Sequence, residues 1–75
     1  MANFSLDQLR QTVAVIEKLD LPLETGNRLK SLGVFEGQRI ELARQGNPLI
    51  IKAAGSRVAI AQTLAKCILV RDAEA

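Results

Sequence analysis

Side chains that could carry out hydrolysis or acid–base chemistry are scarce in this chain. The sequence contains no histidine and a single cysteine, Cys67. Ser5, Ser31 and Ser56 each lack a neighbouring base that would activate the hydroxyl group. Lys52 is a conceivable general base, but a lone lysine in a predicted strand is typical of a solvated side chain. We therefore expect no catalytic residue and no enzyme activity.

Iron ligands are equally sparse. Fe(II) sites usually combine imidazole nitrogen with carboxylate oxygen, and this chain has no imidazole. Its eight acidic residues are scattered among basic neighbours. Cys67, next to Ile68, fits a small buried or half-buried hydrophobic side chain, with a redox or ligand role as the alternative. The sequence therefore predicts neither a metal site nor a bound cofactor.

The glycine-containing segment from Gly33 to Gly37 invites comparison with a phosphate-binding loop. A P-loop carries Lys followed by Ser or Thr and opens a helix. This segment, with the sequence Gly-Val-Phe-Glu-Gly, lacks that pair and follows a predicted helix instead. We expect a structural turn there, not a nucleotide site.

Composition predicts one small soluble domain over residues 1–75, with a frayed tail at 71–75 that has lost all apolar pattern. The chain is 48% hydrophobic with only two aromatic residues, both Phe, which favours a compact aliphatic core. A single cysteine fits a reducing compartment. The N-terminus lacks a signal peptide, and no stretch approaches the roughly 18 apolar residues of a membrane span. We expect a cytoplasmic protein that does not insert into membranes.

Residues 28–37 are predicted to form the end of a helix and the turn that follows it. Leu29 and Leu32 are three residues apart and share a helix face, while Gly33 occupies the place where helices commonly end in a left-handed residue. The helix is predicted to begin at Asp20-Leu21-Pro22, or alternatively at Thr25, and to run to about Leu32. The alternative arises because Gly26 costs a helix about 1 kcal/mol relative to alanine.

Short apolar and alternating segments predict strands around this helix. Leu6 and Leu9 are expected to pack beneath the first strand, and Gln62–Lys66 to form one helical turn. Glycine and asparagine in the loop 45–48 suit positive φ angles. The predicted strands are Thr12–Leu19, Gln38–Arg44, Leu49–Ala53, Arg57–Ala61 and Cys67–Val70.

Five short strands favour a closed barrel, because closure removes exposed strand edges. The fold class predicted is mainly β: a small antiparallel β-barrel with one inserted α-helix and a short helical turn before the last strand. The expected core residues are Val13, Val15, Leu29, Leu32, Ile40, Leu42, Ile51, Val58, Ile60, Ile68 and Val70.

Sequence motifs in this order have a counterpart in a known family. The chain has the pattern R-L-x-x-L-G-V-x-x-G at 28–37, a proline-containing loop and strand at 46–51 followed by Gly55, and closing segments at 58–60 and 65–70. Together they resemble the FeoA family of small cytoplasmic proteins associated with bacterial ferrous-iron uptake, whose fold is an SH3-like β-barrel. The resemblance spans roughly residues 6–70.

The resemblance implies a non-enzymatic accessory role, in which the barrel docks onto the cytoplasmic G-protein region of the membrane transporter FeoB and modulates Fe(II) transport. The sequence departs from the family pattern at several positions. Glu36 stands where the family often has proline, Ala61 where it often has arginine, and Gln11-Thr12 lacks the usual glycine. These departures do not change the expected fold. They affect surface side chains, and a divergent member of the family could therefore bind a different partner.

Nucleic-acid binding is the alternative function, because small barrels often bind RNA or DNA. Single-strand binders stack bases on aromatic side chains, and this chain offers only Phe4 and Phe35. Acidic residues also interrupt the basic ones, and the net charge is only +2. We therefore expect no nucleic-acid partner. The basic residues considered for such a face are Arg28, Lys30, Arg39, Arg44, Lys52 and Arg57.

A protein-binding rim is the favoured functional site. Leu29 and Phe35 either belong to the core or, if Phe35 projects from the turn between the two glycines, form an apolar anchor for a partner. An aromatic anchor beside arginine is typical of interface hot spots. The predicted partner-binding residues are Arg28, Leu29, Phe35 and Arg39.

Overall fold

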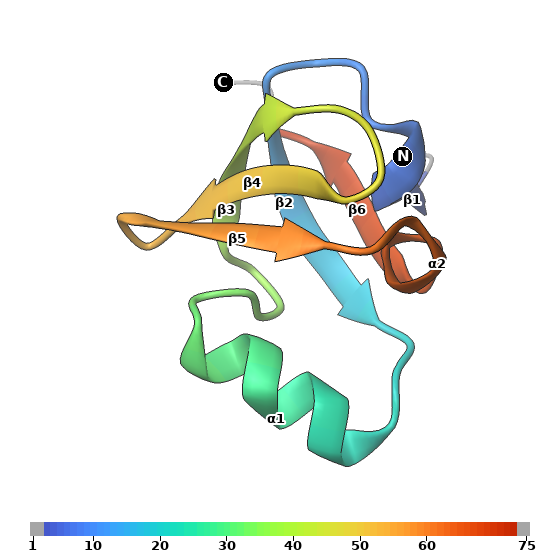
Figure 1. The fold of residues 1–75 in the computed structure, drawn as a ribbon, viewed down its shortest axis with the longest axis vertical. Helices are drawn as coiled ribbons and strands as arrows, with labels where there is room; N and C mark the ends of the chain where they lie inside the picture. Colours follow the sequence, from blue (N-terminus) through green and yellow to red (C-terminus); the bar gives the residue numbers. More distant parts are fainter. Residues whose placement is uncertain (1–2, 74–75) are drawn as a thin grey trace.

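The computed structural model describes residues 3–73, which form an antiparallel β-sheet with helical segments between its strands (Figure 1). In the order of the chain, the elements are β1 (Phe4–Ser5), the 3₁₀ helix η1 (Leu6–Gln8), β2 (Val13–Leu19), α1 (Leu23–Ser31), β3 (Arg39–Arg44), β4 (Leu49–Ala53), β5 (Ser56–Ile60), α2 (Gln62–Ala65) and β6 (Ile68–Asp72).

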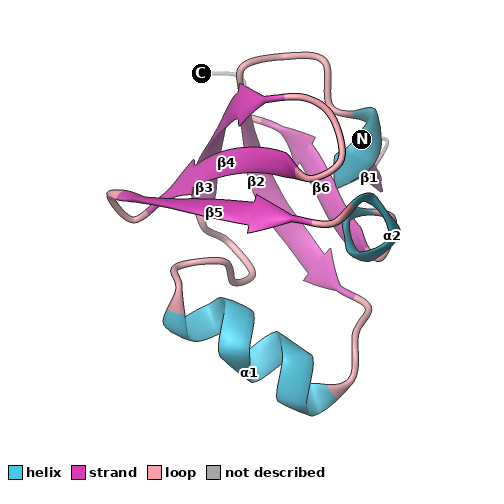
Figure 2. Cartoon of the chain, in the orientation of Figure 1, coloured by secondary structure: helices cyan, strands magenta, loops and turns pink. Residues whose placement is uncertain are grey.

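The predicted closed barrel is wrong in one respect, because the sheet stays open. Within residues 3–73 the six strands lie in the order β1-β6-β2-β3-β4-β5, so β1 and β5 are its two edges. The sheet curls, and β4 and β5 cross the direction of β2 and β6 (Figure 2). Near the end of β5 the chain enters α2, which contacts η1. Helical segments therefore occupy the place where strand pairing would close a barrel.

Both ends of the chain contribute more strand than predicted. β1 pairs with β6 through Phe4 opposite Val70, and β6 continues past Val70 along β2. Arg71 lies opposite Val15, and its Nε donates to Glu17 Oε1 at 2.7 Å. The predicted fraying is therefore wrong for residues 71 and 72, which pair with β2, and residues 74–75 lie outside the described chain.

The buried face of β2 is the opposite of the one predicted. Ala14 and Ile16 are 0% and 1% exposed, whereas Val13 and Val15 are only half-buried. Ala14 lies opposite Ile40, which is also buried, so both residues face the core. Alternation along a strand then places both valines on the outer face.

The predicted helix end is confirmed in detail. The N–H of Gly33 donates to the carbonyl of Lys30 at 3.0 Å, and the N–H of Val34 donates to that of Leu29 at 2.9 Å. With φ +96° at Gly33, these bonds form a Schellman motif, and Val34 and Leu29 are both buried, in keeping with the apolar contact that commonly accompanies this motif.

The ends of α1 correct two expectations. The helix follows Pro22 directly, so the start at Asp20-Leu21-Pro22 is close and the cap at Thr25 is wrong. Leu32, predicted to be a core residue, is 44% exposed. Its backbone, with φ −96° and ψ 3°, has left the helix, so its side chain no longer follows the face of Leu29.

The two hairpins and the short helix follow the predicted pattern within one or two residues. Gly46 takes the expected positive φ, whereas Asn47 precedes a cis peptide bond and its Oδ1 accepts from the Gln62 N–H at 3.0 Å. Ala54 and Gly55 both have positive φ, as a type I′ hairpin turn requires.

One aliphatic core fills the inside of the curled sheet. Leu6 and Leu9 are each 1% exposed and belong to this core, as predicted. Leu42 is half-buried and packs against it, and the other predicted core residues of β3 to β6 are buried. The buried residues are Leu6, Leu9, Ala14, Ile16, Leu29, Val34, Ile40, Leu49, Ile51, Ala53, Val58, Ile60, Ala65, Ile68 and Val70.

Candidate functional site

A groove of about 410 Å³ lies beside α1, and we call it the α1 groove. One face of the helix lines it at the spacing i, i+3, i+4 and i+7, through Leu23, Gly26, Asn27 and Lys30. The rest of its lining comes from the end of β2, the loop before α1 and the turn after it, through Leu19, Leu21, Pro22, Phe35 and Glu36.

Phe35 enters the groove from a turn that is fixed to β2. The N–H of Gln38 donates to the Phe35 carbonyl at 3.0 Å, and Gly37 takes φ +89°, which suits the third position of a type II turn. The N–H of Gly37 donates to the Ile16 carbonyl at 2.8 Å, and the N–H of Ile16 donates to the Gln38 carbonyl at 2.9 Å. The aromatic side chain is therefore held on a hydrogen-bonded support, which lowers the entropy cost of binding a partner.

The groove has an apolar surface open to solvent. Leu23 is 79% exposed, and Phe35 is half-buried without belonging to the hydrophobic cluster of the described residues. Leu19 and Leu21 pack against that cluster, so the wall of the groove continues into the core. An exposed leucine and a half-buried phenylalanine beside a packed core are the features expected of a surface that binds another protein.

Gly26 leaves room in the middle of this surface. It lies inside α1 and is half-buried, yet a Cβ built on it meets no described atom within 4 Å apart from its chain neighbours and the backbone of its own helix. Internal packing therefore does not require glycine here, although glycine costs a helix about 1 kcal/mol relative to alanine. The missing side chain keeps the helix backbone accessible from the groove.

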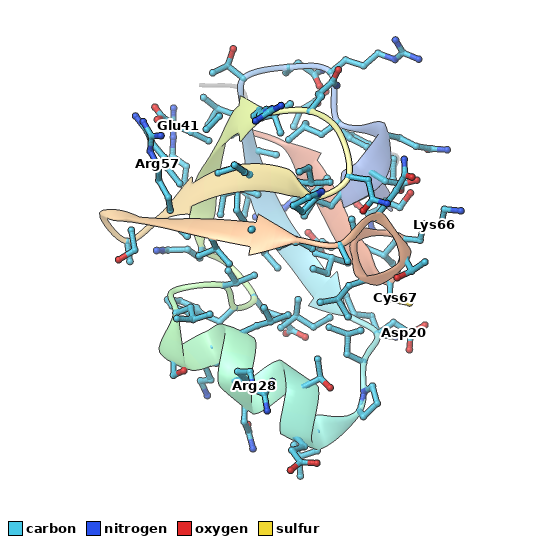
Figure 3. All side chains as sticks on the ribbon, in the orientation of Figure 1. Asp20, Arg28, Glu41, Arg57, Lys66 and Cys67 are labelled. Atoms are coloured by element: carbon cyan, nitrogen blue, oxygen red, sulfur yellow. The ribbon has the colours of Figure 1, made fainter. Side chains whose placement is uncertain are left out.

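The structure separates the predicted partner-binding residues. Phe35 lines the α1 groove, whereas Leu29 is 5% exposed and belongs to the core. Arg28 is exposed on α1 but does not line the groove (Figure 3), and Arg39 lines a second hollow with Thr12 and other residues. The predicted cluster is thus spread over different surfaces, and its role in binding stays a prediction.

Sequence reasoning missed most of the groove. Leu23 was not considered, Gly26 was considered only for the course of the helix, and Lys30 only for a basic face. Their spacing of three and four residues was a usable signal, because such positions share a helix face. The contribution of Leu19 and Leu21 depends on how β2 meets α1, which local sequence does not encode.

The scarce metal-binding side chains do not gather. Within residues 3–73 no group of three or more Cys, Asp or Glu side chains is placed to hold a metal ion. Cys67 is half-buried beside α2, with Sγ 3.9 Å from the Thr63 carbonyl oxygen (Figure 3). No helix in the described part of the chain is long and apolar enough to cross a membrane.

Comparison with known proteins now identifies the family. The FeoA domain family model matches residues 4–72. A protein of Methanocaldococcus jannaschii named Fe(2+) transport protein A is 38% identical over 61 residues, which are 80% of this chain and 74% of that protein. The chain therefore belongs to the FeoA family, which is associated with ferrous iron transport and not with a known enzyme activity.

Solved structures agree with this assignment and confirm the SH3-like fold. The Stenotrophomonas maltophilia FeoA, crystallised with zinc and described as an SH3 domain protein, has a TM-score of 0.73 at 29% identity, over 89% of this chain and 88% of that one. A FeoA described as an iron uptake regulatory protein has a TM-score of 0.81 at 24% identity, over 95% of this chain and 97% of that one. The second likeness shows the fold alone.

Proposed function

We propose that this protein is a cytoplasmic, non-enzymatic accessory protein of ferrous iron uptake, which docks on the G-protein region of the FeoB transporter and modulates Fe(II) transport. Membership of the FeoA family supports the link to iron transport. The Stenotrophomonas relative is itself described as a candidate activating factor of bacterial ferrous iron transport.

The observation that carries this proposal is the α1 groove with Phe35 at its wall. Exposed Leu23 and half-buried Phe35 supply apolar contact area, and Lys30 and Glu36 supply one charge of each sign at the same groove. Apolar anchors with charged neighbours are the arrangement found at protein interfaces. The proposed docking surface is therefore the α1 groove, with Phe35 as its anchor and Gly26 as its open centre.

The first test removes the anchor. Phe35→Ala is expected to weaken binding to the FeoB cytoplasmic domain of the same organism by about thirtyfold, because truncating an interface anchor typically costs about 2 kcal/mol or more. Titration calorimetry measures the affinity after circular dichroism has shown the variant to be folded. Lys66→Ala, an exposed change on the C-terminal side of α2, serves as the control and should bind as the wild type does.

A second variant tests the groove without removing any contact. Gly26→Leu places a side chain where the described chain leaves open space, so the helix should form while the groove is filled. Loss of binding in both Phe35→Ala and Gly26→Leu supports the groove. If both folded variants bind with wild-type affinity, docking uses another face of the protein. If the wild type does not associate even with nucleotide-loaded full-length FeoB, the accessory hypothesis itself is wrong.

A further inference from the structure

The two edges of the sheet differ in length and regularity. β1 has two residues, whereas β5 has five and pairs with β4 in an unbroken register from Leu49 opposite Ile60 to Ala53 opposite Ser56. The register shifts of this sheet lie between β2 and β6 and between β3 and β4. Short strands and bulges are common ways to blunt an edge, and β5 has neither.

β5 offers a row of backbone groups to a further strand. Its hairpin turn of two residues makes Ala53 and Ser56 a hydrogen-bonded pair, and hydrogen-bonded and non-hydrogen-bonded pairs alternate from there. The N–H and C=O groups of Arg57 and Ala59 therefore point away from β4. In the described part of the chain β5 pairs with no second strand, and both residues are exposed.

One row of charged side chains crosses β3, β4 and β5, and its last member, on β5, has no acidic cross-strand neighbour in the described part of the chain. Glu41 lies opposite Lys52, and Lys52 lies opposite Arg57, so two positive side chains are direct cross-strand neighbours. Figure 3 shows Glu41 and Arg57 on the same side of the sheet. Among residues 3–73 the ion pair within 4 Å is Arg71 with Glu17, which leaves Arg57 without one. Like charges directly opposite each other destabilise a sheet, and an acidic neighbour would offset this.

We propose that the outer edge of β5 binds an extended, acidic segment of another protein as an added β-strand. The backbone groups of Arg57 and Ala59 form the ladder bonds, and an Asp or Glu of the incoming strand faces Arg57. A second copy of this chain fits less well, because it would bring another Arg57 to the same edge, with Lys52 on the strand behind it. This surface is separate from the α1 groove and does not depend on FeoB.

The direct test is a titration of the ¹⁵N-labelled protein with a capped hexapeptide of alternating valine and aspartate, followed by NMR. The amide signals of Arg57 and Ala59 are expected to shift saturably, and the affinity to fall with added salt. A peptide with lysine in place of aspartate should leave these signals unchanged. Shifts confined to the α1 groove, or equal shifts with both peptides, would overturn the proposal.

Two pairs of variants test separately how the backbone N–H of Ala59 and the charge of Arg57 contribute to peptide binding. Ala59→Pro removes the outward N–H at a position where an edge strand tolerates proline, and should weaken the acidic peptide about tenfold, while Ala59→Val keeps the N–H and the affinity. Arg57→Glu should abolish binding. Lys66→Glu makes the same change in net charge elsewhere and should bind as the wild type does.

The contrary results are equally concrete. If folded Ala59→Pro and Arg57→Glu both bind the acidic peptide with wild-type affinity, the β5 edge is not the site. If analytical ultracentrifugation shows that the wild type self-associates and that Ala59→Pro does not, the occupant is a second copy and the proposed partner is wrong.

Discussion

Two glycines of the α1 region have different reasons to be glycine. At Gly33, φ is +96°, and an added Cβ would lie 2.8 Å from the Cβ of Ala54 and 3.2 Å from the carbonyl oxygen of Ala53. Gly26 has no positive φ, and an added Cβ there meets no described atom within 4 Å apart from its chain neighbours and the backbone of α1. Fold stability therefore requires glycine at position 33 and opposes it at position 26.

The same substitution at these two positions should have opposite effects on stability. Gly33→Ala is expected to lower the free energy of unfolding by about 2 kcal/mol or more, through left-handed backbone strain and overpacking. Gly26→Ala should raise it by about 1 kcal/mol, because alanine is the better helix former. Urea unfolding followed by circular dichroism measures both, each variant serving as the control for the other. Equal effects of the two changes would contradict this account of the turn.

At the scale of single residues, local chemistry was predictable and the choice of face was not. The helix end at Gly33 follows from capping rules that involve only nearby residues. The choice between Val13 with Val15 and Ala14 with Ile16 depends on which face the other strands cover. Both sets alternate along β2, so the pattern alone does not distinguish them.

At the scale of elements, β2 holds the site in place. It pairs with β3 and β6, and the backbone of Ile16 is hydrogen-bonded to Gly37 and Gln38, the last two residues of the turn that begins at Phe35. Displacement of β2 would therefore disturb both the core and the α1 groove.

Substitutions along β2 should reproduce its observed face. Ile16→Ala removes a side chain that is 1% exposed and should cost about 2–4 kcal/mol of unfolding free energy, through lost burial and a cavity. Val15→Ala, at a half-buried outer position, should cost about 1 kcal/mol or less. Chemical denaturation of the two variants compares them directly. A larger loss of unfolding free energy for Val15→Ala than for Ile16→Ala would contradict the observed orientation of β2 and favour the buried face predicted from sequence.

Elements with strong local patterns were predictable, and those fixed by distant pairing were not. The strand Leu49–Ala53 matches the structure residue for residue, because apolar residues bounded by turns define it. β1 was not predicted, because a strand of two residues is too short to show an alternation of polar and apolar side chains. The extension of β6 through Arg71 and Asp72 depends on pairing with β2 and on the contact with Glu17, both remote in sequence.

At the scale of the molecule, sequence predicted the class of fold but not the arrangement of its surfaces. The order of strands, helix and turns predicted a small, mainly β fold, and the resemblance to the FeoA family implied its SH3-like architecture. Phe35 was predicted as a site residue from its place between two glycines, and it does line the groove. Arg28 and Arg39 were grouped with it by sequence proximity, yet the turn and β3 carry Arg39 to a different hollow.

The central claim, that this protein modulates ferrous iron transport through FeoB, is tested most directly by Fe(II) uptake into proteoliposomes that contain FeoB and GTP. Adding the wild-type protein should change the initial uptake rate, and Phe35→Ala, if folded, should leave the rate at that of FeoB alone, because the anchor of the α1 groove is missing. Lys66→Ala should act as the wild type does. An uptake rate that is the same with and without the wild-type protein would contradict the account.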